Sequence, residues 1–383
     1  MAQPLRLDVR QIVAALSGLG VLLPSLSAIS EDESSKGASS VEVERIVTKS
    51  KAPAACIAWK NAWVFYQYSP IDRKWHSWST PPIAELPRRG GFSSVAASHS
   101  VVVDPLKNYS GWRFDLDQRH WREIPPSPLD GAAQGGAMYY APIVVAVLPD
   151  RLFIWGKNRG PPHGAILDFA TNRWSLVEEA PVETRWGAIS GVIGGKVVIW
   201  GGYRARTKLD DGATFDVATG IWETIAAPPM PFAYGMVGTC WNGGLVIAAG
   251  RGQFRMMIYD VPSKKWTTST DAPVEVGEYP AVTVLGDRVF LWSGHVKDSP
   301  NRRDGLTYDL LQKKWERIPA APVEGRWLPL AFSDDERAIV WGGWLSSPDR
   351  FLTDGAEFDA KSGIWRRLAE MPGEVPRQLH PGW

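Results

Sequence analysis

Short apolar runs separated by glycine- and proline-rich turns follow one another along most of the chain, and residues 185–227 show one complete unit. It begins with a small-residue run, "RWGAISGVIGG", and a β-branched run, "KVVIWGG", joined through a Gly-Gly turn. A polar loop, "YRARTKLDDG", leads to "ATFDVATGIW" and then to "WETIAA", which Pro228 and Pro229 end. Such runs joined by tight turns are typical of hairpins, and proline ends a strand because it lacks the ladder donor. The pattern predicts a sheet of four short antiparallel strands.

The end of this unit recurs along the chain as an apolar residue, an Asp, five further residues and a Trp. The Asp positions are 115, 168, 216, 260, 309 and 359, and a seventh copy has Ser69 in the Asp place. The Trp anchors of the seven copies lie 44 to 53 residues apart at Trp75, Trp121, Trp174, Trp222, Trp266, Trp315 and Trp365. A repeat of about 50 residues is the mark of a propeller array, in which each unit is one four-stranded sheet.

A second column of tryptophans falls in the second strand of the unit. Four repeats have a Trp there, followed in most by glycine: Trp155, Trp200, Trp292 and Trp341. Because both faces of a propeller sheet are covered, we expect these rings in the core. The composition agrees: 44% apolar, 22% charged, with 37 Gly, 30 Pro and 20 Trp, it favours short strands and turns. The sequence therefore predicts an all-β protein.

These features are similar to the kelch repeat: a double glycine closing the second strand, an aromatic residue and Asp in the third, and a Trp six residues later. The resemblance covers roughly residues 50–383 and is strongest over 143–371. It is weaker in the first two units, where "HSVVVDPLKN" lacks the double glycine. Kelch proteins fold as six- or seven-bladed β-propellers, so the resemblance implies that architecture here.

The two ends of the repeat region predict how the ring closes. The first unit has residues for three strands, "AACIAWK", "WVFYQYS" and "WHSWS", but no clear innermost one. Near the carboxyl terminus, "MPGEVPRQLHPGW" aligns with the beginning of the innermost strand in other units. We expect this strand to complete the first blade and remove exposed sheet edges. The prediction is a β-propeller over residues 49–383, with seven four-stranded kelch-type blades closed by a C-terminal strand.

The amino terminus differs from the repeats. Residues 1–30 have arginines before an apolar stretch and small residues before Glu31, and they resemble a secretory signal peptide. The alternative is an amphipathic or disordered leader. Residues 31–48 read as a flexible linker, because 31–40 are charged and serine-rich. A cleaved leader implies an extracytoplasmic or secreted protein, and otherwise the protein is cytoplasmic. Cys56 and Cys240 lie four repeats apart, so we expect buried thiols rather than a disulfide.

One opening of the predicted ring gathers the starts of the innermost strands and the loops after the second strands, because alternate strands run in opposite directions. The strand starts form a column rich in arginine: Arg89, Gln134, Arg185, Ala233, Glu278, Arg326 and Arg377. The next place is aromatic in four repeats: Trp186, Tyr234, Tyr279 and Trp327. Loop cations such as Arg204, Arg303 and Arg350 add positive charge, although the whole chain has a net charge of only +1. Guanidinium groups and aromatic faces suit a carboxylate-bearing ligand.

A purely structural role is the alternative for these arginines, which can instead bond to neighbouring loop carbonyls. For the binding role we expect Arg185 and Arg326 to be exposed, so that replacing both changes stability by no more than about 1 kcal/mol. Asp211, Asp304 and Asp354 precede glycine and are predicted to form turns, as are the recurring Asp residues before each Trp anchor.

Glu278 is the only acid in the arginine column and is the candidate catalytic residue, as general acid or base, with a plain salt bridge as the alternative. The chain has no G-x-S-x-G, H-E-x-x-H or phosphate-loop motif and no paired cysteines at metal spacing. His163, His295 and His380 can approach this arginine-rich opening, the mouth of the ring, but the scattered histidines predict no metal site. We therefore expect no metal and no cofactor.

Two functions are compatible with this sequence. The first is a non-enzymatic, monomeric recognition scaffold that binds an acidic peptide, protein or glycan at the basic mouth, with no nucleic-acid partner and no membrane span. The alternative is a carbohydrate-active enzyme acting on an acidic sugar as an epimerase or mutarotase. For that alternative, the chain resembles the bacterial N-acetylneuraminate epimerases in organisation, without a shared active-site motif.

Overall fold

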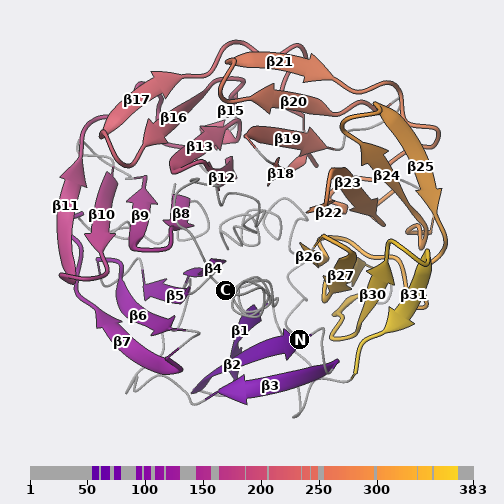
Figure 1. Ribbon diagram of the computed structural model, residues 1–383, viewed down its shortest axis with the longest axis horizontal. Helices are drawn as coiled ribbons and strands as arrows, with labels where there is room; N and C mark the ends of the chain where they lie inside the picture. The colour runs from indigo at the N-terminus through magenta and orange to yellow at the C-terminus, as the bar shows by residue number, and fades with distance from the viewer. Residues whose placement is uncertain are drawn as a thin grey trace, which may run out of the picture.

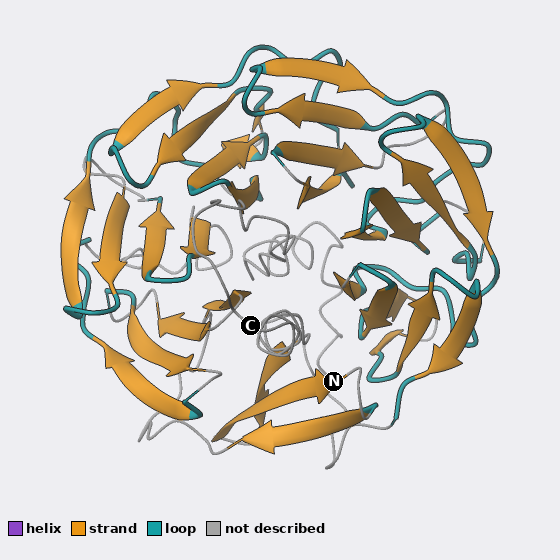
Figure 2. Ribbon diagram, in the orientation of Figure 1, coloured by secondary structure: helices purple, strands orange, loops and turns teal. Residues whose placement is uncertain are grey.

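The structure of the chain is a computed structural model that describes residues 54–59, 62–69, 73–78, 92–96, 99–104, 108–115, 118–129, 144–156, 164–185, 187–204, 207–233, 235–241, 243–248, 254–296, 300–333, 335–346 and 349–369. All regular secondary structure in this part of the chain is β-strand (Figure 2). The prediction of an all-β protein is confirmed.

The strands form antiparallel sheets that follow one another in chain order around a ring (Figure 1). In each sheet the first strand lies toward the centre and the last strand lies at the rim. The described strands give one three-stranded sheet, six four-stranded sheets and two two-stranded hairpins. Repeated four-stranded sheets in this arrangement are compatible with a β-propeller.

We number the larger sheets in chain order. Sheet 1 contains β1 (Ala54–Trp59), β2 (Ala62–Ser69) and β3 (Lys74–Trp78), and sheet 2 contains β4 (Phe92–Ala96), β5 (His99–Asp104), β6 (Ser110–Asp115) and β7 (His120–Ile124). Sheet 3 contains β8 (Val144–Val147), β9 (Arg151–Trp155), β10 (Gly164–Asp168) and β11 (Arg173–Val177). Sheet 4 contains β12 (Ile189–Ile193), β13 (Lys196–Trp200), β16 (Gly212–Asp216) and β17 (Ile221–Thr224).

The remaining sheets repeat the same order. Sheet 5 contains β18 (Val237–Trp241), β19 (Gly244–Ala248), β20 (Met257–Asp260) and β21 (Lys265–Thr268). Sheet 6 contains β22 (Ala281–Leu285), β23 (Arg288–Trp292), β24 (Gly305–Asp309) and β25 (Lys314–Ile318). Sheet 7 contains β26 (Leu330–Ser333), β27 (Arg337–Trp341), β30 (Gly355–Asp359) and β31 (Ile364–Arg367).

The loop between the second and third strands is itself a small hairpin in sheets 4 and 7. In sheet 4, β14 (Tyr203–Arg204) pairs with β15 (Thr207–Lys208), and in sheet 7, β28 (Trp344–Ser346) pairs with β29 (Asp349–Phe351). The sequence predicted only a polar loop at 203–212, so this hairpin was missed. Its two-residue strands are too short to give an alternating pattern.

The tryptophans of the second strands form the core between neighbouring sheets, as predicted. Trp155, Trp200 and Trp292 are fully buried and Trp341 is 6% exposed. The first three pack against the Trp anchor of the sheet that follows: the pairs are Trp155–Trp222, Trp200–Trp266 and Trp292–Trp365, with ring centroids 5.6–6.3 Å apart. Large aromatic rings in edge or tilted contact therefore hold one sheet against the next.

The Trp anchors also tie the sheets together through hydrogen bonds. In four consecutive steps the indole N–H donates to the carbonyl four residues after the preceding anchor: Trp174 to Pro125, Trp222 to Glu178, Trp266 to Ala226, and Trp315 to Thr270. Trp365 continues the series with a 2.9 Å bond to Pro319. The acceptor thus lies at the same place in each unit, four residues after the anchor, so one bond is repeated from sheet to sheet.

Sheet 1 makes the same contacts with sheet 7. The indole N–H of Trp75 donates to the carbonyl of Ala369 over 3.1 Å, and Ala369 lies four residues after Trp365. The rings of Trp75 and Trp341 lie 5.8 Å apart, and Arg73 forms an ion pair with Glu357 at 3.7 Å. The first and last sheets therefore lie side by side.

The recurring Asp before each anchor accepts a hydrogen bond from a backbone N–H of the following turn, as predicted. The donor lies three residues on in all six copies, with distances of 2.7–3.0 Å, at Asp115, Asp168, Asp216, Asp260, Asp309 and Asp359. These bonds hold the pKa of Asp168, Asp216 and Asp359 below the usual value. Asx-type bonding of this kind explains why the Asp recurs in each unit.

Three predictions fall outside the described residues: the leader at 1–30, the linker at 31–48, and the strand expected within 371–383. In the part of the chain that the structure describes, no helix has the length and apolar character needed to cross a membrane. Cys240 is a buried free thiol, as expected, and burial raises its pKa to about 12.

Candidate ligand-binding face

Arg185 lies before the first strand of sheet 4, and its guanidinium group is buried among the loops at that end of the sheet. The residue is 1% exposed. It donates to the carbonyls of Glu183 and Asp211 at 2.9 and 3.0 Å, and to the Asp211 carboxylate at 2.6 and 3.2 Å. A longer bond of 3.3 Å reaches the carbonyl of Gly201. Arg185 thus joins three segments of the loop region with one planar group.

Arg326 occupies the same place in sheet 7. It is also 1% exposed, and it donates to the carbonyls of Glu324, Gly342 and Asp354 and to the Asp354 carboxylate at 2.7 Å. Its Nη2 is buried without a partner, whereas Nη2 of Arg185 reaches Asp211. Asp354 instead turns its other oxygen to within 3.7 Å of Arg367. Burial lowers the pKa of Arg326, against the opposing effect of Asp354.

The expectation that these two guanidinium groups are exposed is therefore wrong. Their contacts match the structural alternative, since each bonds to loop carbonyls, and their role in ligand binding stays a prediction. Asp211 and Asp354, expected only to form turns, supply the paired carboxylates. The sequence signal for this pairing was present, because the two arginines and the two Asp-Gly pairs occur in the same units.

Glu278 belongs to a different column from the one expected. Glu278 forms an isolated β-bridge with His295, just as Trp327 does with Trp344, so Glu278 corresponds to Trp327. The residue that corresponds to Arg326 is Gly277, where a Cβ atom would meet backbone atoms at 2.5 Å. The alignment of this unit was therefore wrong by one position, because the sequence alone does not fix the register of an irregular strand entrance.

Positive backbone φ angles support the corrected register. The place after Trp327 has a positive φ in all four described units: Gly187, Gly235, Tyr279 and Leu328, at 50° to 82°. The amide of Tyr279 donates to Gly235, and that of Leu328 donates to Tyr279, so this column is also a chain of bonds between sheets. Tyr279 is 6% exposed, and it lies one place beyond the aromatic column to which it was assigned.

The described residues bring together only part of the predicted site. Glu278, Tyr279 and Trp327 lie at the junction of sheets 6 and 7, where Glu278 is 4% exposed and Trp327 is 6% exposed. The role of the Glu278 carboxyl group as a general acid or base stays a prediction. The other predicted ligand-binding residues lie outside the described part of the chain: Arg89, Trp186, Tyr234 and Arg377.

Most described cations on this face have an acidic neighbour. On the two loop hairpins, Arg204 pairs with Glu183, and Arg350 pairs with Glu324 at 2.6 Å. In the loop before β24, Arg302 pairs with Asp304 through bonds of 2.9 and 2.6 Å. The described part of the mouth is therefore lined by ion pairs, which is a more balanced surface than the arginine count predicted.

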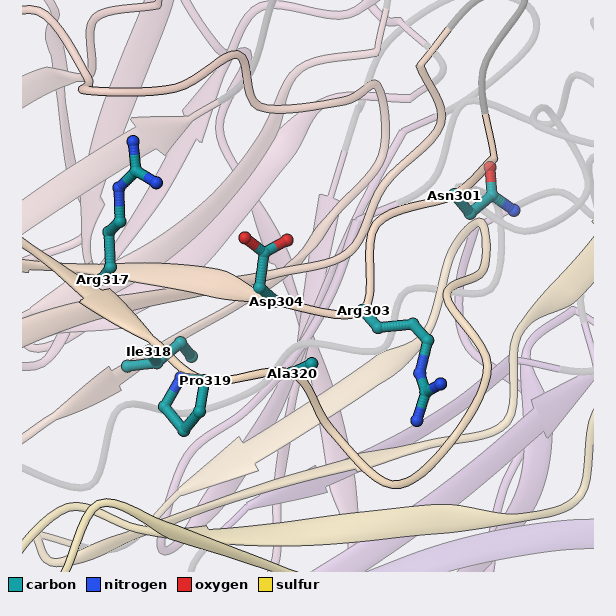
Figure 3. Close-up of a pocket in the computed structure, with 7 residues that line it drawn as sticks. All are labelled: Asn301, Arg303, Asp304, Arg317, Ile318, Pro319 and Ala320. Atoms are coloured by element: carbon teal, nitrogen blue, oxygen red, sulfur yellow. The ribbon is translucent and has the colours of Figure 1, made fainter.

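An open depression of about 790 Å³ lies at the end of sheet 6 where β24 begins and β25 ends, on the same side of the ring as the mouth (Figure 3). It lies between the loop before β24 and the segment that leaves β25, and it is lined by Asn301, Arg303, Asp304, Arg317, Ile318, Pro319 and Ala320. Arg303 is exposed and donates to the carbonyls of Ala321 and Val323. Arg317 is exposed and makes one long bond, 3.4 Å, to the carbonyl of Pro273.

These two arginines differ from the paired ones. Within the described chain, no carboxylate forms an ion pair with Arg303 or Arg317, so both charges are available to a ligand. Arg303 was among the predicted loop cations, whereas Arg317 was missed because it lies in an outer strand. The described residues also contain no group of three His, Cys, Asp or Glu side chains placed to hold a metal ion.

The sequence of the chain was also compared with known proteins. No protein-family model and no curated protein matches it.

Proposed function

We propose that the chain is a kelch-type β-propeller of seven four-stranded blades. Sheets 2 to 7 each supply one blade, and sheet 1 supplies three strands of another. The bond from Trp75 to Ala369 supports a closed ring, because it is the bond that the five anchors from Trp174 to Trp365 each make with the sheet before them. This sixth bond of the same kind joins the first sheet to the last.

The remaining strand of the first blade is, in this proposal, the segment 371–383. In sheet 1, β1 pairs with β2 on one side and takes the position of a second strand, since each complete sheet has one further strand toward the centre. The chain passes Ala369 beside Trp75, at the rim of sheet 1, shortly before this segment begins. An unpaired inner edge would otherwise expose a row of backbone donors and acceptors.

We further propose that the propeller is a non-enzymatic recognition scaffold that binds an acidic ligand on the face of sheet 6. The observation that carries this is the depression with Arg303 and Arg317 in its wall. Both are exposed and lack an ion-pair partner in the described chain, and a guanidinium group offers carboxylates a planar pair of donors. Ile318, Pro319 and Ala320 add an apolar wall against which a peptide or sugar can pack.

The fixed orientation of Arg303 favours recognition. Arg303 is held by two carbonyls of the segment that leaves β25, so its guanidinium group is oriented before any ligand arrives. A group fixed in its bound position loses less conformational entropy when the ligand binds. Arg303 thus combines a positive charge with a fixed direction.

The test is retention of acidic peptides and acidic glycans on an array by wild type and by Arg317→Ala. We expect retention to fall about tenfold, as for the loss of one charge-assisted contact. Arg303→Lys keeps the charge but loses the fork, and we expect an intermediate loss.

The matched control is Arg173→Ala, because Arg173 is exposed at the beginning of β11, at the opposite end of its strand from this face. Its retention should equal that of wild type. If Arg317→Ala and Arg173→Ala retain ligands equally well, the depression is not the binding site.

A further inference from the structure

A second group of side chains at the junction of sheets 6 and 7 has unused hydrogen-bonding capacity. Glu278 and His295 face each other across an isolated antiparallel bridge in which each backbone N–H donates to the other carbonyl at 2.8 Å. Directly opposed residues of such a pair place their side chains on the same side. The corresponding bridge, Trp327 with Trp344, shows this, since its rings lie 5.3 Å apart.

The bridge brings an imidazole against an indole. The ring of His295 lies with its centroid 4.0 Å from that of Trp327, tilted by 31°. Trp327 is buried, and its indole N–H has no hydrogen-bond partner. A buried donor without a partner is costly, so a ligand atom that accepts from this N–H would offset that cost.

Asn301 fixes the tautomer of His295. The Asn301 amide donates from Nδ2 to the carbonyl of Gly325 at 3.3 Å, so its Oδ1 is the atom that faces His295 Nδ1 at 3.3 Å. Because a carbonyl oxygen only accepts, Nδ1 must carry the proton. In neutral His295, Nε2 is then a hydrogen-bond acceptor, and no described residue donates to it.

We infer that this cluster, formed by His295, Asn301 and Trp327, binds a hydroxyl group of a saccharide. A hydroxyl group is both donor and acceptor, so it can donate to Nε2 of His295 and accept from the indole N–H of Trp327. The half-buried ring of His295, which packs against the buried ring of Trp327, gives apolar surface for the carbon side of a sugar. A ligand with only carboxylate oxygens can satisfy the indole but not the imidazole acceptor.

Asn301 connects the cluster to the depression, because it bonds to His295 and also lines the wall with Arg303. This inference deepens the proposed function by naming a glycan as the ligand of that face. The two can fail separately, since one depends on the cations of the depression and the other on an uncharged pair of side chains.

The test follows the indole N–H signal of Trp327 by NMR, assigned through its loss in Trp327→Phe. Three probes are titrated: methyl β-glucoside, glucuronic acid and acetate. We expect both sugars to shift the Trp327 signal, and acetate to shift it far less at the same concentration, because acetate makes only one of the two bonds. We also expect His295→Phe, which keeps the ring contact but lacks the acceptor, to weaken binding of both sugars about tenfold. The ¹⁵N shifts of His295 should show a proton on Nδ1.

Arg317→Ala separates the two proposals. It should weaken binding of glucuronic acid but leave binding of methyl β-glucoside unchanged. If acidic peptides bind through Arg317 while neither sugar moves the Trp327 signal, the saccharide inference is overturned and the recognition scaffold stands. Equal sugar affinities of wild type and His295→Phe would also overturn it.

Discussion

Replacing Arg185 with methionine tests whether the buried arginines of the column, Arg185 and Arg326, stabilise the fold. Methionine keeps much of the apolar stem but removes every donor, so the carbonyls of Glu183, Gly201 and Asp211 lose a partner. Breaking a buried ion pair costs about 3–5 kcal/mol, and a hydrogen bond to a charged group contributes about 1.5–3 kcal/mol. The Asp211 carboxylate is 53% exposed and can be solvated, which reduces the loss. We expect the free energy of unfolding to fall by about 2–4 kcal/mol.

The assay is urea unfolding followed by circular dichroism, with the midpoint and slope compared between variants. Arg204→Ala is the matched control, since Arg204 lies in the same loop region and pairs with Glu183 on the surface. Exposed ion pairs contribute about 0–1 kcal/mol, so this variant should unfold close to wild type. A loss below about 1 kcal/mol for Arg185→Met, together with lost ligand retention, would refute the structural role and restore the predicted binding role.

Three further predictions test the bonds between sheets, the acid response and the absence of turnover. Trp75→Phe and Trp266→Phe each remove one indole donor, so each should lower the free energy of unfolding by about 1 kcal/mol in the same denaturation assay. An unchanged free energy of unfolding for Trp75→Phe would argue against ring closure. The backbone amide of Thr171 is the main cause of the lowered pKa of Asp168 in the folded state. The ionised carboxylate therefore stabilises the fold above the unfolded pKa of about 4, and this stabilisation is lost as pH falls through the folded pKa. In thermal melts from pH 7 downward, the melting temperature should fall less for Asp168→Asn than for wild type. Anomeric equilibration of sialic and uronic acids, followed by NMR, should proceed equally fast with buffer, wild type and Glu278→Gln, and acceleration by wild type alone would assign Glu278 to catalysis.

The repeat explains how much of the fold the sequence could predict. The Asp and Trp of each unit are read easily because each makes the same local or next-sheet bond in every copy, as at Asp216 and Trp222. The entrance to the first strand is harder, because it is irregular backbone whose register depends on the neighbouring sheet. Glu278 was misplaced by one position there, and its place is shown by the bridge to His295 together with the positive φ of Tyr279.

The candidate site was less predictable than the fold, for an electrostatic reason. A count of arginines gives charge but not burial. Arg185 and Arg326 are buried, and their guanidinium groups donate hydrogen bonds to other residues of the protein. Arg317 lies on an outer strand, where the sequence gives no sign that it borders a depression. Pairing and exposure of charged groups emerge only when loops from different parts of a unit are placed together.

Ring closure by the carboxyl-terminal segment is the central claim, and hydrogen exchange of the full chain measures it directly. We predict that backbone amides within residues 371–383 exchange as slowly as those of β1, because both would belong to one blade. Exchange of the whole segment at the rate of an unstructured peptide would contradict the closed seven-bladed ring.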